Sequence, residues 1–243
     1  MRLAILSDIH GNLRALEIVL ADLATRGVDA TVNLGDCVTS PLWPRETLEL
    51  LDTLALPTVR GNHDRWVAQL PRVQMSQTIA STCDALSAEQ RRSLGLLPAT
   101  LQLDNDVFAV HGTPDSDVDY LLEEAVEGRL SLVTAATLGQ RLGEDRHESL
   151  ILCGHSHNQH TAHAPGNRLI INPGSVGCPR YADNENPFRA ESSTPHARYA
   201  IATRRSGRWS VELFALDYDW DAVAERAIAN GRRDWAEAFL AGR

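Results

Sequence analysis

The chain has 243 residues, of which 43% are hydrophobic and 23% charged, a composition typical of globular domains rather than disordered chains. Its formal net charge of −9 disfavours long nucleic acids as partners, because proteins that hold DNA or RNA present a basic face to the phosphates. All 23 basic residues are arginine. The absence of lysine excludes Schiff-base catalysis and the lysine of a phosphate-binding P-loop.

The cysteines and the N-terminal segment predict a cytoplasmic chain. The four cysteines are widely spaced and form no CxxC pair, which argues against a disulfide framework and against a structural zinc knuckle. No apolar run approaches the roughly 18–20 residues that span a bilayer, so no membrane partner is expected. Asp8 and His10 follow the short apolar N-terminal run, which we interpret as a buried strand and not as a signal peptide.

The first sixty residues predict a layered α/β fold. We expect strands at 2–7, 30–34 and 56–59, and helices at 12–26 and 44–54. The second helix has proline in its first turn, a favoured position for that residue. This alternation of strands and helices is typical of a mostly parallel sheet covered by helices.

The rest of the chain predicts further strands and helices within one domain, residues 1–243. Residues 181–197 are polar and contain proline, so we expect a surface loop there, either a lid over a site or a plain insertion. The other expected elements are helices within 65–97, a hairpin at 100–103 and 107–111, a loop with helices at 115–142, strands at 149–153, 159–164, 168–171, 198–204 and 209–216, and one or two helices at 219–241.

Polar clusters follow the predicted strands. Ligands of α/β sheets bind beyond the carboxyl ends of the strands, so clusters that are distant in sequence can converge there. Singly each is weak evidence, since an aspartate at a strand end also caps helices. Their carboxylate, imidazole and amide groups suit Mn, Fe, Zn or Mg rather than thiolate-bound metals. The clusters are SDIHGN (Ser7–Asn12), GDCV (Gly35–Val38), GNHD (Gly61–Asp64), VHGT (Val110–Thr113) and GHSHN (Gly154–Asn158).

Taken together, the motifs D-x-H-G-N, G-D, G-N-H-D, H-G and G-H-x-H, in this order, resemble the calcineurin-like metallophosphoesterase superfamily. The segment NPGSVGCPR, Asn172–Arg180, is similar to a stretch typical of the compact bacterial and archaeal phosphodiesterase branch. The resemblance spans about residues 1–199. It implies an α/β fold, a four-layer α-β-β-α sandwich of two mixed β-sheets, with a two-metal site at one edge.

The resemblance also implies the ligands of two divalent ions, with Asp36 shared between them. Manganese is the ion we expect, and iron, zinc, nickel and magnesium are the alternatives. His160 and His163 share the histidine-rich segment but match no motif position, so we expect ordinary strand residues there. The implied ligands are Asp8, His10, Asp36 and His157 for the first ion, and Asp36, Asn62, His111 and His155 for the second.

Such metal pairs activate water for in-line attack on phosphorus and neutralise charge on the phosphate. The resemblance gives His63 the role of protonating the leaving group, oriented by Asp64. The alternative is a purely structural His63 that hydrogen-bonds Asp64. We expect Asn12 to contact the substrate phosphate or to cap a helix. Arg180 is expected either to bind phosphate or to be a solvated surface arginine.

The expected activity is metal-dependent hydrolysis of phosphate esters, as a phosphatase or phosphodiesterase of small phosphorylated or nucleotide substrates. Alternatives are hydrolysis of dinucleoside polyphosphates, dephosphorylation of phosphoproteins, and a non-enzymatic scaffold, which the complete set of ligands disfavours. A homo-oligomer is compatible with the sequence, as is a monomer. Acidic residues after the H-G motif would repel long polyanions from the mouth of the site; they are Asp115, Asp117, Asp119, Glu123 and Glu124.

Overall fold

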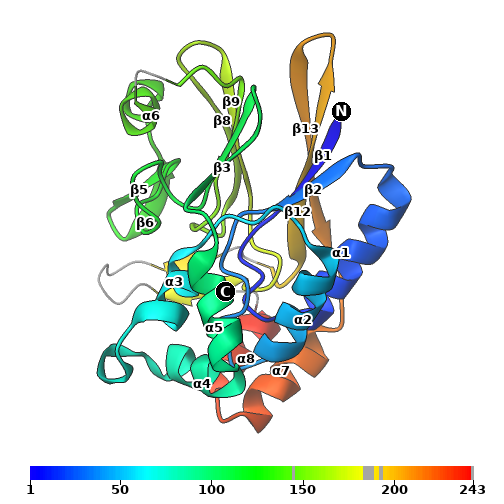
Figure 1. Ribbon diagram of the computed structural model, residues 1–243, viewed down its shortest axis with the longest axis vertical. Helices are drawn as coiled ribbons and strands as arrows, with labels where there is room; N and C mark the ends of the chain where they lie inside the picture. Colours follow the sequence, from blue (N-terminus) through cyan, green and yellow to red (C-terminus); the bar gives the residue numbers. More distant parts are fainter. Residues whose placement is uncertain (144–145, 183–188, 192–193, 242–243) are drawn as a thin grey trace.

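The structure is a computed structural model that describes residues 1–143, 146–182, 189–191 and 194–241 (Figure 1). It describes the side chains of these residues except those from 180 to 193. None of the helices in the described part of the chain is long and apolar enough to cross a bilayer.

Two mixed β-sheets form the centre of the molecule, as the resemblance implies. In the first sheet, β1 pairs in parallel with β2 and antiparallel with β12. In the second, β4, β7 and β9 run parallel. The first sheet has the order β13 (Arg208–Leu216), β12 (Ala197–Arg205), β1 (Arg2–Leu6), β2 (Ala30–Asn33), and the second β3 (Thr100–Asp104), β4 (Val107–Val110), β7 (Leu150–Leu152), β9 (Arg168–Pro173), β8 (Gln159–Ala164).

The central strands are apolar on both faces because each sheet is covered on both sides. Successive side chains of a strand point to opposite faces. Ile5 of β1 therefore packs in the core between the sheets, while Leu6 packs toward the helices. Ile171 of β9 likewise faces the other sheet, and Ile170 faces the outer helix. This double burial explains the continuous apolar runs in the sequence.

Helices complete the four layers. α1 (Leu13–Arg26) and α2 (Pro44–Leu54) contribute to the core on the outer side of the first sheet, and α6 (Ala135–Leu142) to the core on the outer side of the second. The remaining helices gather beyond one end of the sheets, in the lower half of Figure 1; they are α3 (Asn62–Gln69), α4 (Gln77–Ala85), α5 (Ala88–Leu96), α7 (Trp220–Ala229), α8 (Arg233–Ala241) and the 3₁₀ turn Arg72–Gln74.

Three expected elements differ in the structure. The strand expected at 56–59 is absent, since only Thr58 bridges Asn33 before the chain turns into α3. Where a loop with helices was expected, β5 (Glu123–Val126) and β6 (Arg129–Leu132) form a hairpin before α6. Its two turn residues, Glu127 and Gly128, both have positive φ, as the favoured two-residue turn requires.

The expected loop at 181–197 is the third difference. Its two ends include a short antiparallel pair, β10 (Arg180–Ala182) and β11 (Arg189–Glu191). Residues 183–188 and 192–193, about half of the segment on which the choice between lid and insertion depends, lie outside the described residues.

Candidate metal centre

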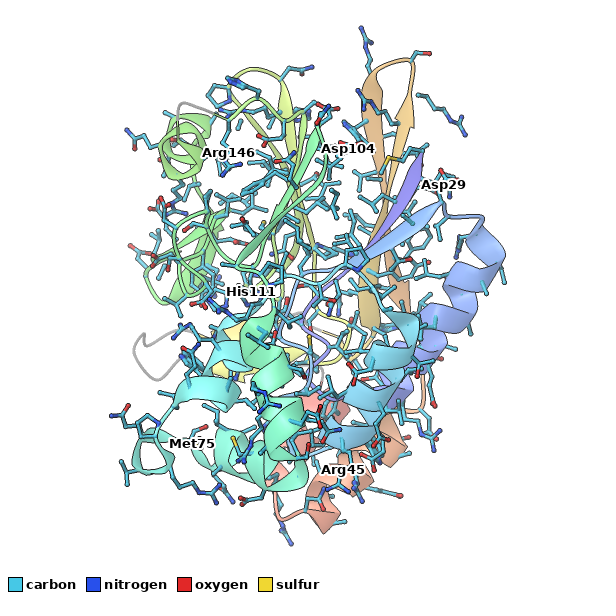
Figure 2. All side chains as sticks on the ribbon, viewed as in Figure 1. Asp29, Arg45, Met75, Asp104, His111 and Arg146 are labelled. Atoms are coloured by element: carbon cyan, nitrogen blue, oxygen red, sulfur yellow. The ribbon has the colours of Figure 1, made fainter. Side chains whose placement is uncertain are left out.

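The candidate ligands come from five loops at one end of the two sheets. Four of these loops follow β1, β2, β4 and β7, and the fifth opens α3. Figure 2 labels His111, which lies where the lower ends of the strands meet the helices, whereas Asp104 lies at the far end of the second sheet. The loops pack so closely that a Cβ on Gly61 would lie 2.1 Å from Asp36 Oδ1, so only glycine fits there.

The backbone at these loops is strained. Five candidate ligands have a left-handed backbone, a conformation that L-residues with a side chain rarely adopt. Such angles persist only where surrounding contacts enforce them, and they cluster at functional sites. The residues and their φ angles are Asp8 (54°), His10 (47°), Asp36 (54°), His155 (67°) and His157 (59°).

Asp8, His10 and His157 form the first of two groups that could hold a metal ion. Their nearest side-chain atoms all lie within 4.8 Å of one another, and all three residues are buried. His10 Nε2 lies 3.2 Å from His157 Nε2. The same His157 atom lies 3.3 Å from Asp8 Oδ1.

Asp36, His111 and His155 form the second group, within the same limit of 4.8 Å. Asn62 adjoins it, with Oδ1 2.9 Å from His111 Nε2. Asp36 Oδ2 lies 3.5 Å from His111 Nε2 and 3.6 Å from His10 Nε2. The Asp36 carboxylate therefore lies between the two groups.

In each histidine of the two groups, one ring nitrogen forms a hydrogen bond with a backbone carbonyl oxygen. A carbonyl only accepts hydrogen bonds, so that nitrogen carries a proton, and in the neutral ring that a metal ion binds the other nitrogen offers its lone pair. This arrangement orients histidines for metal binding. The pairs are His10 Nδ1 with Thr39 O (3.0 Å), His111 Nδ1 with Leu34 O (2.7 Å), His157 Nδ1 with Cys178 O (2.8 Å) and His155 Nε2 with Val118 O (3.0 Å).

The residues fit a pair of cations because the atoms that converge are ring nitrogens and carboxylate oxygens. The Nε2 atoms of His10 and His157 face each other at 3.2 Å. Asp8 Oδ1 is buried and has no hydrogen-bond partner among the described residues. Buried acceptors that meet in this way require a positive charge between them. Nitrogen and carboxylate donors suit borderline divalent ions.

The electrostatics of the two carboxylates agree with this fit. Burial alone would raise the pKa of Asp8, but the charge of protonated His157 lowers it to about 2. Burial would also raise the pKa of Asp36, which His111 and His63 hold well below its usual range. Both side chains are therefore ionised at neutral pH, as metal ligands must be.

Residues 1–192 match the calcineurin-like phosphoesterase superfamily domain. The chain belongs to that superfamily. An uncharacterized protein of Methanocaldococcus jannaschii is 27% identical over 266 residues, 99% of this chain and 98% of that protein. A metallophosphoesterase of Sphaerobacter thermophilus is also 27% identical, with a TM-score of 0.74 and both chains fully covered. A hypothetical protein of Pyrococcus horikoshii shares the fold, with 19% identity, a TM-score of 0.78, and 100% and 98% of the two chains covered.

The chain is thus a metal-dependent phosphoesterase whose dinuclear-site residues are intact. His160 and His163 of this phosphoesterase lie in β8, as predicted. They are outside both groups of potential ligands. The histidine-rich segment therefore contributes two side chains to the centre, one to each group.

The Asp64 carboxylate bonds to backbone N–H groups and not to Nδ1 of His63, so it does not orient the ring by the direct contact that the resemblance led us to expect. It accepts hydrogen bonds from the backbone N–H groups of Asp36 (2.9 Å), Cys37 (3.0 Å) and Gly61 (2.9 Å). The reason is geometric: Asp64 is the third residue of α3 and caps its first turn, so it points back into the loops. It joins the loop of Asp36 to the loop of α3.

The His63 ring lies beside the metal centre without a partner for its Nδ1 atom among the described residues. The ring is 5.2 Å from the His10 ring, centroid to centroid. The backbone N–H of His63 donates to Asp36 Oδ1 at 2.9 Å, which fixes the start of α3 against this carboxylate. Burial lowers the pKa of His63 to about 3, so the ring is neutral at pH 7 and carries one N–H.

Of the two alternatives for Asn12, the structure shows the helix cap. Its Oδ1 accepts from Ala15 N at 3.1 Å, and its Nδ2 donates to Gly177 O and to the Tyr218 hydroxyl. Asn12 is fully buried, so its amide has no donor left for a phosphate. Arg180 opens β10, but its side chain lies outside the described side chains.

The acidic segment after His111 is only partly a charged surface. Glu123 is buried, and Asp117 forms a bidentate ion pair with Arg65 of α3, at 2.6 and 2.7 Å. Asp115, Asp119 and Glu124 are exposed, as expected. Three of the five carboxylates are therefore exposed to solvent, whereas Glu123 is buried, and its neighbours in sequence gave no sign of this.

Three aromatic side chains touch the histidines of the centre, and none was predicted from the sequence. Trp66 of α3 meets the His63 ring edge-on at 4.8 Å, and Tyr120 stacks on His155 at 4.8 Å. Trp235 of α8 lies 6.5 Å from His10. The one usable signal was the spacing of Trp66, one helical turn after the GNHD histidine.

Proposed function

We propose that this phosphoesterase hydrolyses phosphate esters of small phosphorylated or nucleotide substrates with two divalent ions. The observation that supports this proposal most strongly is the convergence of histidine nitrogens and ionised carboxylates around the Asp36 carboxylate. The proposed ligands are Asp8, His10, Asp36 and His157 for one ion, and Asp36, Asn62, His111 and His155 for the other.

When bound, such ions supply an activated water and neutralise charge on the phosphate. Manganese is the proposed ion, because mixed imidazole, carboxylate and amide donors suit borderline metals; iron, zinc, nickel and magnesium are alternatives. The chain's own contribution is to hold each donor in one orientation. The four backbone carbonyls on the histidine rings do this directly.

The proposed role of His63 is to protonate the leaving group as an imidazolium, the form of the ring that the negative charge of a bound phosphate favours. Its ring adjoins the centre, and its unpartnered Nδ1 leaves it free to turn toward a substrate oxygen. Asp64 supports this role through the backbone: it ties the first turn of α3 to the loop of Asp36. Asp64 is thus proposed as a positioning residue for His63 and for Asp36.

Small substrates are supported by the surroundings of the centre. The exposed carboxylates of Asp115 and Asp119 flank Val118, whose carbonyl holds His155, so a long polyanion would meet negative charge there. The aromatic rings of Trp66 and Tyr120 are partly exposed and suit an ester with a planar group such as a nucleobase.

We also propose that residues 1–243 act as one metallophosphoesterase domain. The C-terminal helices lie beyond the stretch that matches the family, which ends at residue 192. Yet α8 brings Trp235 to 6.5 Å from His10, and α7 and α8 share a core with Leu42. We therefore propose that the pair of helices α7 and α8 lines one side of the centre.

A substrate panel with added Mn²⁺ tests the proposed function. It should compare an aryl monoester, an aryl diester, a cyclic nucleotide, a dinucleoside polyphosphate and a phosphopeptide. We expect turnover of small esters that Asp36→Ala abolishes, because both ions lose a ligand, while His163→Ala leaves the rate unchanged. Turnover of none of the substrates by protein that contains two metal ions would contradict the proposal, and preference for the phosphopeptide would favour the protein phosphatase.

A further inference from the structure

Behind the metal centre, a buried carboxylate reaches the turn that carries His155 and His157. Glu123 begins β5 and is 2% exposed. Its Oε1 atom accepts a hydrogen bond from Ser156 Oγ at 2.8 Å, and Ser156 is buried as well. Ser156 stands between the two histidines in sequence, and each histidine belongs to a different group of potential ligands.

The turn itself has little regular structure to hold it. His155 and His157 both have left-handed φ angles, 67° and 59°, so the backbone changes conformation at each residue. Strain of this kind must be offset by contacts made elsewhere. The side chain of Ser156 is the part of the turn that faces inward, and it is fully buried.

A second buried side chain reaches the same hydroxyl from β9. Asn172 Nδ2 donates to Ser156 Oγ at 3.0 Å and to the carbonyl of Gly154 at 2.8 Å. Ser156 thus donates to Glu123 and accepts from Asn172 and, at the longer distance of 3.5 Å, from the backbone N–H of Asn158. The three side chains form a relay from β9 through the turn to β5.

Glu123 is anchored independently of the turn. Arg141 of α6 donates from one guanidinium nitrogen to the carbonyls of Tyr120 (2.8 Å), Leu121 (3.1 Å) and Glu123 (2.8 Å). These bonds fix the backbone that enters β5. The neighbouring Glu124 is exposed and takes no part in this network.

We propose that Glu123 is a positioning residue of the metal centre, which through Ser156 holds the turn that presents one histidine to each ion. This inference rests on the proposed two-metal function. The Oε1 atom of Glu123 can accept from the Ser156 hydroxyl whether or not the carboxyl group is ionised. Loss of a supporting contact behind a ligand lowers metal affinity by about 10- to 100-fold.

The test is calorimetric titration of Mn²⁺ into metal-free protein, without substrate. We expect Glu123→Ala and Ser156→Ala each to weaken binding about 10-fold, at the lower end of that range because the contact acts through one intermediate residue. Glu123→Gln keeps an acceptor for Ser156 and should bind within about 3-fold of the parent protein. Glu124→Ala, one residue along the same strand, should bind like the parent.

A double variant separates positioning from general damage. Because Glu123 and Ser156 act in one relay, the double alanine variant should bind Mn²⁺ no more weakly than the poorer single variant. Folded Glu123→Ala with unchanged affinity would overturn the inference, as would equal losses in Glu123→Ala and Glu124→Ala. If Glu123→Ala does not fold, Ser156→Ala takes its place in the test. Unchanged Mn²⁺ affinity of Ser156→Ala would then overturn the inference. A parent protein that binds no Mn²⁺ would instead remove the proposed function itself.

Discussion

The strain and charge of this phosphoesterase are concentrated in single residues at the loop ends. Asp36 combines a left-handed backbone with a carboxylate that lies near histidines of both groups. Its amide N–H is held by Asp64, and its Oδ1 accepts the N–H of His63. One residue thus joins the start of α3 to the metal centre. We therefore expect a substitution of His63 to affect the rate, and a substitution of Asp36 to affect metal binding.

His63→Ala should separate proton transfer from metal binding. The ring is beside the centre but in neither group of ligands, so the variant should keep both metal ions and lose about 10²–10⁴-fold in rate, the usual contribution of general acid catalysis. The loss should be largest for alkyl esters and smallest for p-nitrophenyl esters, whose leaving group needs no proton. Rates on a series of leaving groups, with metal analysis, check this; an equal loss across the series would assign His63 to charge stabilisation or positioning.

Glu123→Gln should make the protein more stable above neutral pH. Burial raises the pKa of Glu123 from 4.5 to about 7, although Ser156 and Arg141 act in the opposite direction. A carboxyl whose folded pKa is raised loses stability as pH rises from its unfolded value to its folded value, here between pH 4.5 and about 7. At pH 8 ionised Glu123 therefore costs up to about 3 kcal/mol, which the neutral amide avoids.

Thermal unfolding in EDTA at pH 5 and pH 8 checks the prediction. The difference in midpoint between Glu123→Gln and the parent protein should grow in favour of the variant by several degrees at the higher pH. Glu124→Gln is the matched control, because this neighbouring side chain is exposed, and its difference should not change with pH. A pH-independent difference for Glu123→Gln would show that the buried carboxyl titrates normally.

At the scale of elements, an ion pair ties α3 to the loop that follows β4. Arg65 donates twice to Asp117, and the same loop supplies the Val118 carbonyl and the Tyr120 ring that contact His155. The pair is partly buried, with side chains 31% and 18% exposed, so solvent screens it incompletely. The loop thus links the helix of His63 to the ligand His155.

Asp117→Asn should loosen residues 112–122. We expect the lost charge-assisted bonds to cost about 1 kcal/mol, which corresponds to about 5-fold faster hydrogen exchange of the loop amides. Mass spectrometry of exchange checks this. Asp84→Asn is the control, because it breaks another bidentate arginine pair, Arg72–Asp84, that is exposed and on α4. Unchanged exchange in Asp117→Asn would mean that backbone bonds alone hold the loop.

The elements that sequence reasoning predicted are those with strong local signals. β1 and α1 combine a continuous apolar run with helical spacing, an Asn12 cap and a Gly27 stop, and both were found. The β5–β6 hairpin was missed because its strands are mostly exposed and show no alternation. Trp235 and Glu123 could not be assigned to the centre, since packing between distant segments decides their places. The members of the two groups were expected from the family resemblance, and they converge because the motifs follow strands whose ends meet.

At the scale of the whole molecule, the metal centre draws its residues from both sheets and from a helix. Its candidate ligands come from the loops after β1 and β2 of the first sheet, from those after β4 and β7 of the second, and from α3. Elsewhere a hydrophobic core, the Arg204–Asp106 ion pair and the hydrogen bond from Trp209 to Ser149 join the two sheets. The end of the sandwich is different, because buried carboxylates and lone pairs repel one another there unless a cation lies between them.

Metal binding should therefore stabilise the entire fold. An ion that binds the folded chain alone contributes about 2.7 kcal/mol at a free concentration of 100 times its dissociation constant, and two sites contribute about twice that. For a chain of this length, each kcal/mol raises the unfolding midpoint by about 2–4 °C. We expect Mn²⁺ to raise the midpoint by roughly 10–20 °C over the value in EDTA.

Scanning calorimetry with Mn²⁺ and with EDTA measures this increase in the unfolding midpoint. Asp36→Ala should lose most of it, because one carboxylate adjoins both groups, whereas His160→Ala in β8 should keep it whole. Equal midpoints with Mn²⁺ and EDTA would contradict the coupling, since convergent buried acceptors that gain nothing from a cation cannot be a metal centre.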